Sequence, residues 1–182
     1  NKNLYVYSRI MITKLLKLIK IVYQNYFEIA SCLCATLIIL IALLLDNLLN
    51  LNACPLCILI RYIFGLIALI SLVGFFVKKL NYVVRFLILS LSIYGIVISS
   101  KLIYLQNLSS EEIALLTPGC DMPLATQIEY FGLFEGLANV YKGGPSCALE
   151  VWRFIFNFAE WGLIFFCVYF IANLFKAMTH FK

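Results

Sequence analysis

Two cysteines separated by two residues are the part of this sequence best suited to chemistry. Cys54 and Cys57 lie in the stretch NACPLCILIRYIFG, and Arg61 follows four residues after the second cysteine. A disulfide between such close cysteines closes a very small loop, so it removes little chain entropy and stabilises a fold only weakly. Pairs with this spacing are more often redox-active or metal-binding. The spacing therefore favours thiol–disulfide exchange over a structural crosslink.

A second pair of cysteines, Cys120 and Cys147, lies in a long loop between two apolar segments. The other three cysteines lie inside apolar segments, where a reduced thiol is a small apolar side chain; they are Cys32, Cys34 and Cys167. Two alternatives to a redox relay remain, namely two static disulfides or a zinc site of four thiolates. We expect no metal, and the single histidine, His180 in the C-terminal tail, excludes a histidine-based triad.

The composition indicates an integral membrane protein. Of the 182 residues, 64% are hydrophobic and 13% charged, with a mean hydropathy of +0.99, whereas soluble domains carry roughly 25% charged residues. Four continuous apolar segments approach the length of about 20 residues that a membrane-spanning helix needs. They lie near residues 29–45, 58–77, 86–105 and 158–175. We therefore expect an all-α bundle of four transmembrane helices.

The basic residues indicate the orientation of these helices. Lysine and arginine are concentrated before residue 28, between residues 78 and 85, and from residue 176 onward. By the positive-inside rule these segments are cytoplasmic, so both termini lie inside and the loops near residues 46–57 and 106–157 lie outside. The net charge of +5 is then a topology signal and does not indicate nucleic-acid binding. Four of the seven cysteines fall in the outer loops, on the oxidising side.

The sequence divides into three parts. Residues 1–28 alternate lysines with apolar residues at helical spacing, which indicates a basic amphipathic helix on the cytoplasmic surface or a partly disordered tail, but not a cleavable signal. Residues 29–175 form the transmembrane redox domain, and residues 176–182 form a cytoplasmic tail. Within the second outer loop, LATQIEYFGLFEGLANVYKGG carries apolar residues three and four apart from Leu124 to Tyr141. This spacing predicts a short amphipathic helix on the membrane surface, followed by a flexible GGPS turn before Cys147.

Cys57 and Arg61 are expected to share one face of the second helix. Cys57 lies in the first turn, where the helix dipole favours an anion, and Pro55 fits there because that turn has no hydrogen bond for it to break. Arg61 lies one turn deeper on the same face. An arginine inside a membrane is functional by default, so we expect Arg61 to stabilise negative charge on the thiolate or on an electron acceptor. The alternative is an interfacial arginine that reaches the lipid headgroups.

Three motifs together resemble the bacterial disulfide-bond formation protein B (DsbB) family. They are CPLCILIRYIFG, KLIYLQ from Lys101 to Gln106, and CALEVWRFIFNFAEWGL after the second loop cysteine. With the topology, the resemblance covers about residues 43–175. The chain departs from the family's usual pattern between Cys57 and Arg61, where its residues are aliphatic, and at Lys101, where many members have arginine.

The resemblance implies an inner-membrane oxidoreductase that oxidises a periplasmic thioredoxin-fold oxidase, DsbA, and passes the electrons to ubiquinone or menaquinone. In such a relay the partner's thiolate attacks Cys120, Cys147 is released and attacks Cys54, and Cys57 is left as a thiolate beside the quinone. The quinone site would include Cys57, Arg61, Lys101 and Gln106. A lipid-soluble acceptor would explain why the cysteine pair lies at the membrane boundary.

Three other functions remain compatible with the sequence. A DsbI-like enzyme would perform the same chemistry with a dedicated partner. A vitamin K epoxide reductase-like enzyme also couples four helices, a C-x-x-C pair and quinone, but it places the active pair late in the bundle. A membrane protein with fixed disulfides would have no activity, and it would not trap a cysteine-linked partner.

Overall fold

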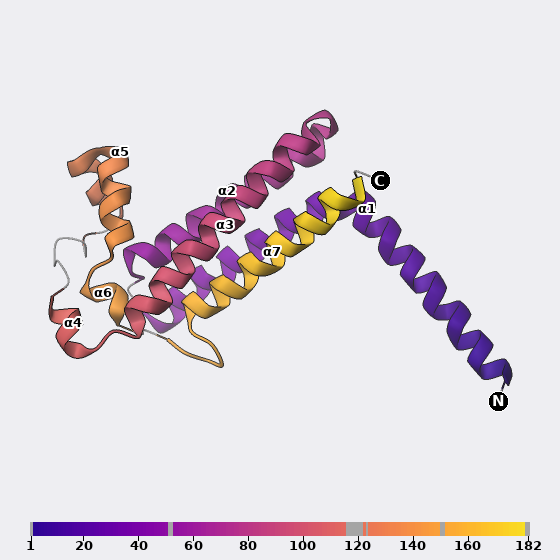
Figure 1. The fold of residues 1–182 in the computed structure, drawn as a ribbon, viewed down its shortest axis with the longest axis horizontal. Coiled ribbons are helices and arrows are strands. Elements are labelled where there is room, and N and C mark those ends of the chain that lie inside the picture. Colours follow the sequence, from indigo (N-terminus) through magenta and orange to yellow (C-terminus); the bar gives the residue numbers. More distant parts are fainter. Residues whose placement is uncertain (1, 51–52, 116–121, 123, 150–151, 181–182) are drawn as a thin grey trace.

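The computed structural model describes residues 2–50, 53–115, 122, 124–149 and 152–180, and four long helices dominate it (Figure 1). These helices are α1 (Lys2–Leu49), α2 (Pro55–Phe76), α3 (Asn81–Gln106) and α7 (Phe158–His180). Each contains a segment long and apolar enough to cross a membrane, namely Tyr26–Leu49, Pro55–Phe76, Asn81–Gln106 and Phe158–Met178. The predicted all-α bundle of four membrane helices is therefore confirmed.

The helices alternate in direction, so the bundle has two chemically different ends. Here the cysteine end is the one at which α1 finishes and α2 starts; the opposite end holds the 3-10 turn η1 (Lys78–Leu80), which joins α2 to α3. Helix α3 packs mainly against α7, and α1 packs against α2. The first helix continues without a break through residue 28, and its N-terminal half projects away from the bundle on the side where the C-terminus lies (Figure 1).

Two aromatic rings fill the centre of the bundle. Phe64 of α2 and Phe166 of α7 stack with their centroids 4.2 Å apart, and both side chains are almost fully buried. Gly95 of α3 faces this stack, and a Cβ atom there would lie 2.5 Å from the Phe166 ring. The absence of a side chain at Gly95 therefore lets α3 and α7 approach closely.

Polar side chains inside the bundle are paired across helices near the opposite end. Arg85 donates a hydrogen bond to the Lys176 carbonyl oxygen at 3.2 Å, and its Nη2 lies 3.8 Å from a Glu28 carboxylate oxygen. The Tyr169 hydroxyl donates to the Ser31 carbonyl oxygen at 2.6 Å. Because unpaired polar groups are costly in a membrane, these contacts stabilise the packing of α1 with α3 and α7.

In the described part of the second loop, three shorter helices cover the cysteine end, namely α4 (Ser110–Ala114), α5 (Leu124–Lys142) and α6 (Pro145–Ala148). The predicted amphipathic helix corresponds to α5, but it consists of two helical segments separated at Gly132, where φ is 79° and ψ is 171°. The segments lie close together, since a Cβ on Gly136 would come within 2.9 Å of the Gln127 carbonyl oxygen. The broken helix forms a compact cap beyond the bundle (Figure 1).

Candidate functional site

Cys54 is the N-cap of α2. Its backbone is extended (φ −64°, ψ 157°), Pro55 occupies the first helical position, and the Cys57 amide donates to Cys54 Sγ at 3.3 Å. A sulfur therefore takes the place of the serine or aspartate oxygen that usually accepts this hydrogen bond. This helix start follows from the sequence. Proline has no N–H to donate, so it fits the first helical position, where no intrahelical hydrogen bond is needed.

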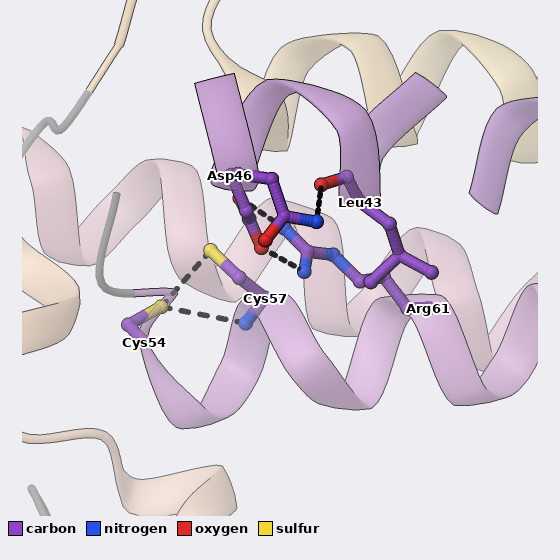
Figure 2. A network of polar contacts seen from close by, with 6 residues as sticks. Leu43, Asp46, Cys54, Cys57 and Arg61 are labelled. Atoms are coloured by element: carbon purple, nitrogen blue, oxygen red, sulfur yellow. Dashed lines mark hydrogen bonds and ion pairs between the residues drawn. The ribbon is translucent and has the colours of Figure 1, made fainter. Parts of the chain in front are cut away.

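The C-x-x-C spacing also brings the two sulfur atoms together. The Cys54 thiol donates to Cys57 Sγ, and the two sulfur atoms lie 3.0 Å apart (Figure 2). Both residues are free thiols in this structure. Cys54 is buried and Cys57 is partly buried, so the pair combines a protected sulfur with a more accessible one.

Cys147 reaches the same place from the second loop. The two glycines before it end α5 and start α6: Gly143 has φ +78°, and a Cβ there would collide with Leu105 of α3. The Cys147 thiol is 1% exposed and hydrogen-bonded to Cys54, and the Leu56 amide donates to its sulfur. The GGPS segment was predicted to be a flexible turn, and it places Cys147 against the start of α2.

The three thiols form a row in which Cys54 is central. Cys147 donates to Cys54, and Cys54 donates to Cys57. The pKa of the Cys147 thiol is raised because it donates to Cys54 and is buried close to that group. For Cys54, the bond from Cys147 favours the thiolate, but donation to Cys57, burial and charge repulsion from Cys57 outweigh it and raise the pKa. The hydrogen-bond order leaves Cys57 as the terminal acceptor of the row.

The remaining cysteines differ from these three. Cys120 lies outside the described residues. The three helix cysteines are free thiols within the long helices α1 and α7; they are Cys32, Cys34 and Cys167. Within the described part of the chain, no cluster of three or more histidine, cysteine, aspartate or glutamate side chains could hold a metal ion.

An apolar pocket of about 260 Å³ opens beside Cys57. Aliphatic side chains of α1 form one wall, and α2 contributes Cys57, Ile60, Arg61 and Phe64. The third wall is mostly aromatic and comes from α7 and the segment before it: Trp152, Phe154, Phe158, Trp161 and Phe165. The ring centroids of Trp152 and Phe158 are 5.0 Å apart, and those of Trp161 and Phe165 are 5.7 Å apart. A flat, apolar ligand fits such a lining.

Arg61 lines this pocket and is paired with Asp46, near the end of α1. Arg61 Nη2 donates to Asp46 Oδ1 at 2.9 Å, and Nη1 donates to Oδ2 (Figure 2). The two side chains are 16% and 17% exposed. Arg61 is thus largely buried and held between α1 and α2 by this ion pair.

The structure does not bring Lys101 and Gln106 to the same pocket, since neither belongs to its lining. Lys101 Nζ lies 5.4 Å from the centre of the Tyr104 ring. Gln106 Oε1 accepts a hydrogen bond of 2.9 Å from Asn157 Nδ2, just before α7. Among the four residues expected to bind the acceptor, Cys57 and Arg61 are therefore adjacent, and the other two lie elsewhere.

Sequence reasoning missed Asp46 and the aromatic wall. Asp46 is separated from Arg61 by 15 residues and lies in a different helix, so no local spacing connects them. The aromatic residues stand in the CALEVWRFIFNFAEWGL motif, but their number alone did not assign them to a pocket. One signal for the ion pair was available in the sequence. Asp46 lies near the end of one apolar segment, and Arg61 lies near the start of the next.

Comparison with known proteins supports the resemblance seen in the motifs. Residues 24–175 match the family model described as Disulfide bond formation protein DsbB. The chain is 27% identical over 160 residues to Disulfide bond formation protein B of Marinobacter nauticus, covering 86% of this chain and 92% of that protein. The protein of the same name in Nitrosococcus oceani is 28% identical over 136 residues, covering 70% of this chain and 75% of that protein.

A third relative, Disulfide bond formation protein B of Saccharophagus degradans, is 31% identical over 121 residues, covering 65% of this chain and 70% of that protein. No solved structure matches the chain significantly. The matched residues include the first three apolar segments, most of the fourth, the three cysteines of the row and the pocket lining. The chain therefore belongs to the DsbB family of disulfide bond formation proteins.

Proposed function

We propose that this protein is a quinone-dependent oxidoreductase of the bacterial inner membrane that reoxidises a periplasmic DsbA-type thiol oxidase. One observation carries the proposal: the sulfur row from Cys147 through Cys54 to Cys57 ends at a large apolar pocket. Two static disulfides do not need a central cysteine in contact with two others. An exchange relay does need one, because a thiolate must reach the sulfur that it attacks.

The relay proceeds by disulfide exchange, with electrons conserved at each step. The partner's thiolate attacks Cys120 of a Cys120–Cys147 disulfide, a mixed disulfide forms, and Cys147 leaves as a thiolate. Cys147 attacks Cys54 of the Cys54–Cys57 disulfide, and Cys57 leaves as a thiolate. The partner's second thiol then attacks its mixed disulfide and releases Cys120, which attacks Cys147 and frees Cys54. The partner is oxidised by two electrons, and Cys54 and Cys57 hold them.

The start of α2 favours this exchange electrostatically. The amides of its first turn have no partners within the helix, and those of Leu56 and Cys57 donate to the sulfurs of Cys147 and Cys54. Negative charge is favoured at this end of a helix dipole. These N–H contacts partly offset the donation within the row and the burial that raise the pKa values of the Cys54 and Cys147 thiols.

The pocket beside Cys57 has the chemistry of a quinone site. A bound ubiquinone or menaquinone accepts two electrons and two protons, matching the two electrons and two thiol protons that leave Cys54 and Cys57. The aromatic wall around Trp161 excludes water and packs against a ring, while Arg61 presents an N–H donor and positive charge close to Cys57. Lys101 and Gln106 lie outside this pocket, so we assign acceptor binding to Cys57 and Arg61.

The location follows from charge and from the chemistry. The segments rich in lysine and arginine join the opposite end of the bundle, which we place in the cytoplasm together with both termini. The cysteine end then faces the periplasm, where disulfides persist. Quinone reaches the pocket through the lipid, which explains why a redox pair lies at the membrane boundary.

The proposal is tested by mixing the purified full-length protein with a reduced DsbA-type oxidase and ubiquinone-1. We expect the partner to lose two thiols for each quinone reduced. When ubiquinone-1 is omitted, partner oxidation should stop after one turnover. A parallel reaction with a short-chain menaquinone compares the two acceptors. Partner oxidation that continues at the same rate without any quinone would contradict the proposal.

A further inference from the structure

Asp46 occupies the whole fork of the Arg61 guanidinium. Each carboxylate oxygen accepts a hydrogen bond from a different terminal nitrogen, and the Nη2–Oδ1 distance is 2.9 Å (Figure 2). Such two-point pairs fix the plane of the guanidinium as well as its position. Only the N–H groups that point away from Asp46 remain for a ligand in the pocket.

This pairing determines where the Arg61 side chain can lie. Arg61 is only one turn deeper than Cys57, close to the membrane boundary, and a long arginine side chain at such a depth can extend toward the headgroups. Asp46 directly follows Leu45, a lining residue of the pocket wall in α1. The ion pair therefore ties the α1 wall to the α2 wall and holds the guanidinium against the pocket.

Asp46 also makes the presence of Arg61 in this apolar lining possible. A charged group without a partner is costly in a membrane protein, and removing one member of a partly buried pair leaves the other uncompensated. With Asp46 in place the resting pair carries no net charge. The Arg61 member of the pair lines the same pocket as Cys57, whereas Asp46 comes from α1.

We propose that Asp46 is a positioning residue for electron transfer to the acceptor, which acts by holding the Arg61 guanidinium at the pocket. The inference rests on the proposed function, since it concerns the same pocket and the same acceptor. It assigns to α1 a part in the chemistry that the cysteine motifs do not contain. Asp46 is not itself a lining residue of the pocket, and its two side-chain hydrogen bonds go to Arg61, so its effect passes through that residue.

The test is a double-mutant cycle on the apparent KM for ubiquinone-1, with the reduced DsbA-type partner varied separately. The variants are Asp46→Asn, Arg61→Gln and the combination of both. Asp46→Asn keeps the shape of the side chain but loses the charge and one of the two acceptors. Asp46→Glu keeps the negative charge and both carboxylate oxygens. Glu28→Gln is the matched control, because it removes the acid of the Arg85 ion pair near the opposite end of the bundle.

We expect Asp46→Asn to raise the KM for ubiquinone-1 about tenfold, as for one charge-assisted hydrogen bond, and to leave the KM for the partner unchanged. Asp46→Glu should recover most of the loss, and Glu28→Gln should resemble the wild type. In the Arg61→Gln background, Asp46→Asn should have no further effect. This non-additivity distinguishes a role through Arg61 from a general loss of stability.

Three results overturn the inference: an unchanged KM in Asp46→Asn, effects of the two substitutions that multiply fully, or a loss that appears equally in the partner's KM. Thermal unfolding of each variant is measured in parallel. A loss of activity that is explained by lower stability alone would also overturn the inference. The two proposals fail differently. A wild-type protein that reduces no quinone refutes the proposed function, whereas an active wild type with an indifferent Asp46→Asn refutes only the positioning role.

Discussion

Gln106 and Asn157 are 51 residues apart in the sequence, yet their side chains are joined by a hydrogen bond of 2.9 Å. Asn157 also accepts a bond from the Glu160 amide, and Glu160 accepts one from the Asn157 amide. These reciprocal bonds form a capping box at the start of α7. Gln106, the last residue of α3, therefore fixes the point from which the aromatic wall of the pocket extends.

We predict that Gln106 works as a hydrogen-bond acceptor for Asn157 and not as a donor to quinone. Gln106→Glu keeps an acceptor and should retain near wild-type quinone kinetics. Gln106→Leu keeps the volume but leaves Asn157 without this acceptor, so it should cost about 0.5–1.5 kcal/mol and raise the KM for ubiquinone-1 severalfold. Equal defects in Glu and Leu variants would instead indicate that the Gln106 amide donates to the acceptor.

The cysteines should separate into two functional groups. Replacing any one of Cys54, Cys57, Cys120 or Cys147 by serine should abolish partner oxidation, since the relay needs each sulfur. The three helix cysteines serve as matched controls, and their serine variants should remain active; they are Cys32, Cys34 and Cys167. Partner oxidation in cells, followed by the redox state of the DsbA-type protein, measures this. Full activity after loss of a loop cysteine would refute the relay.

Arg61 should affect the quinone step and not partner binding. At 4 Å and an effective dielectric near 20, two unit charges interact by roughly 4 kcal/mol. Desolvation and the Asp46 charge cancel part of this, so we expect Arg61→Gln to cost about 1–3 kcal/mol, or ten- to hundredfold. Arg61→Lys should recover part of the activity because it keeps charge but loses the two-point contact with Asp46. Steady-state kinetics, with quinone and partner varied separately, distinguish the two steps. A loss confined to the partner's KM would make Arg61 part of the partner site.

Gly95→Ala should destabilise the bundle. A Cβ there meets the Phe166 ring at 2.5 Å, and the ring cannot retreat because it stacks on Phe64. Overpacking of this kind costs about 1–3 kcal/mol. Gly65→Ala is the matched control, since its nearest neighbour, Ile39 Cδ1, lies at 3.9 Å. Thermal unfolding in detergent should show a lower Tm for Gly95→Ala alone; equal Tm values would mean that the two helices can separate freely.

The raised pKa values of Cys54 and Cys147 predict slow alkylation of the reduced protein. The thiolate is the reactive species, so at pH 8 iodoacetamide should modify both residues more slowly in the folded protein than in the denatured chain. The unfolded thiols ionise near pH 9.0, whereas the folded thiols stay protonated there. Their contribution to stability is therefore complete below that pH and decreases as the pH rises above it. Mass spectrometry of the modified peptides measures the rates, and equal rates in the two states would contradict the hydrogen-bonded row.

The sequence alone was enough to predict the membrane bundle and the close pair of thiols at Cys54 and Cys57. Hydropathy is a property of continuous segments, so all four spanning helices could be placed from it. A C-x-x-C pair that includes Pro55 imposes a helix start and a close sulfur contact through covalent geometry. The same local logic placed Arg61 one turn beyond Cys57, and it identified the loop helix, although not its break at Gly132.

Only the tertiary structure decided what surrounds these residues. Cys147 meets Cys54, Asp46 binds Arg61, and Gln106 binds Asn157 because helices and loops distant in the sequence pack at particular angles. No periodicity or spacing encodes those angles. They result from contacts such as the Phe64–Phe166 stack against Gly95, which set how closely the helices approach. The pocket beside Cys57 is therefore a product of packing, whereas the cysteine pair on its wall is a product of local sequence.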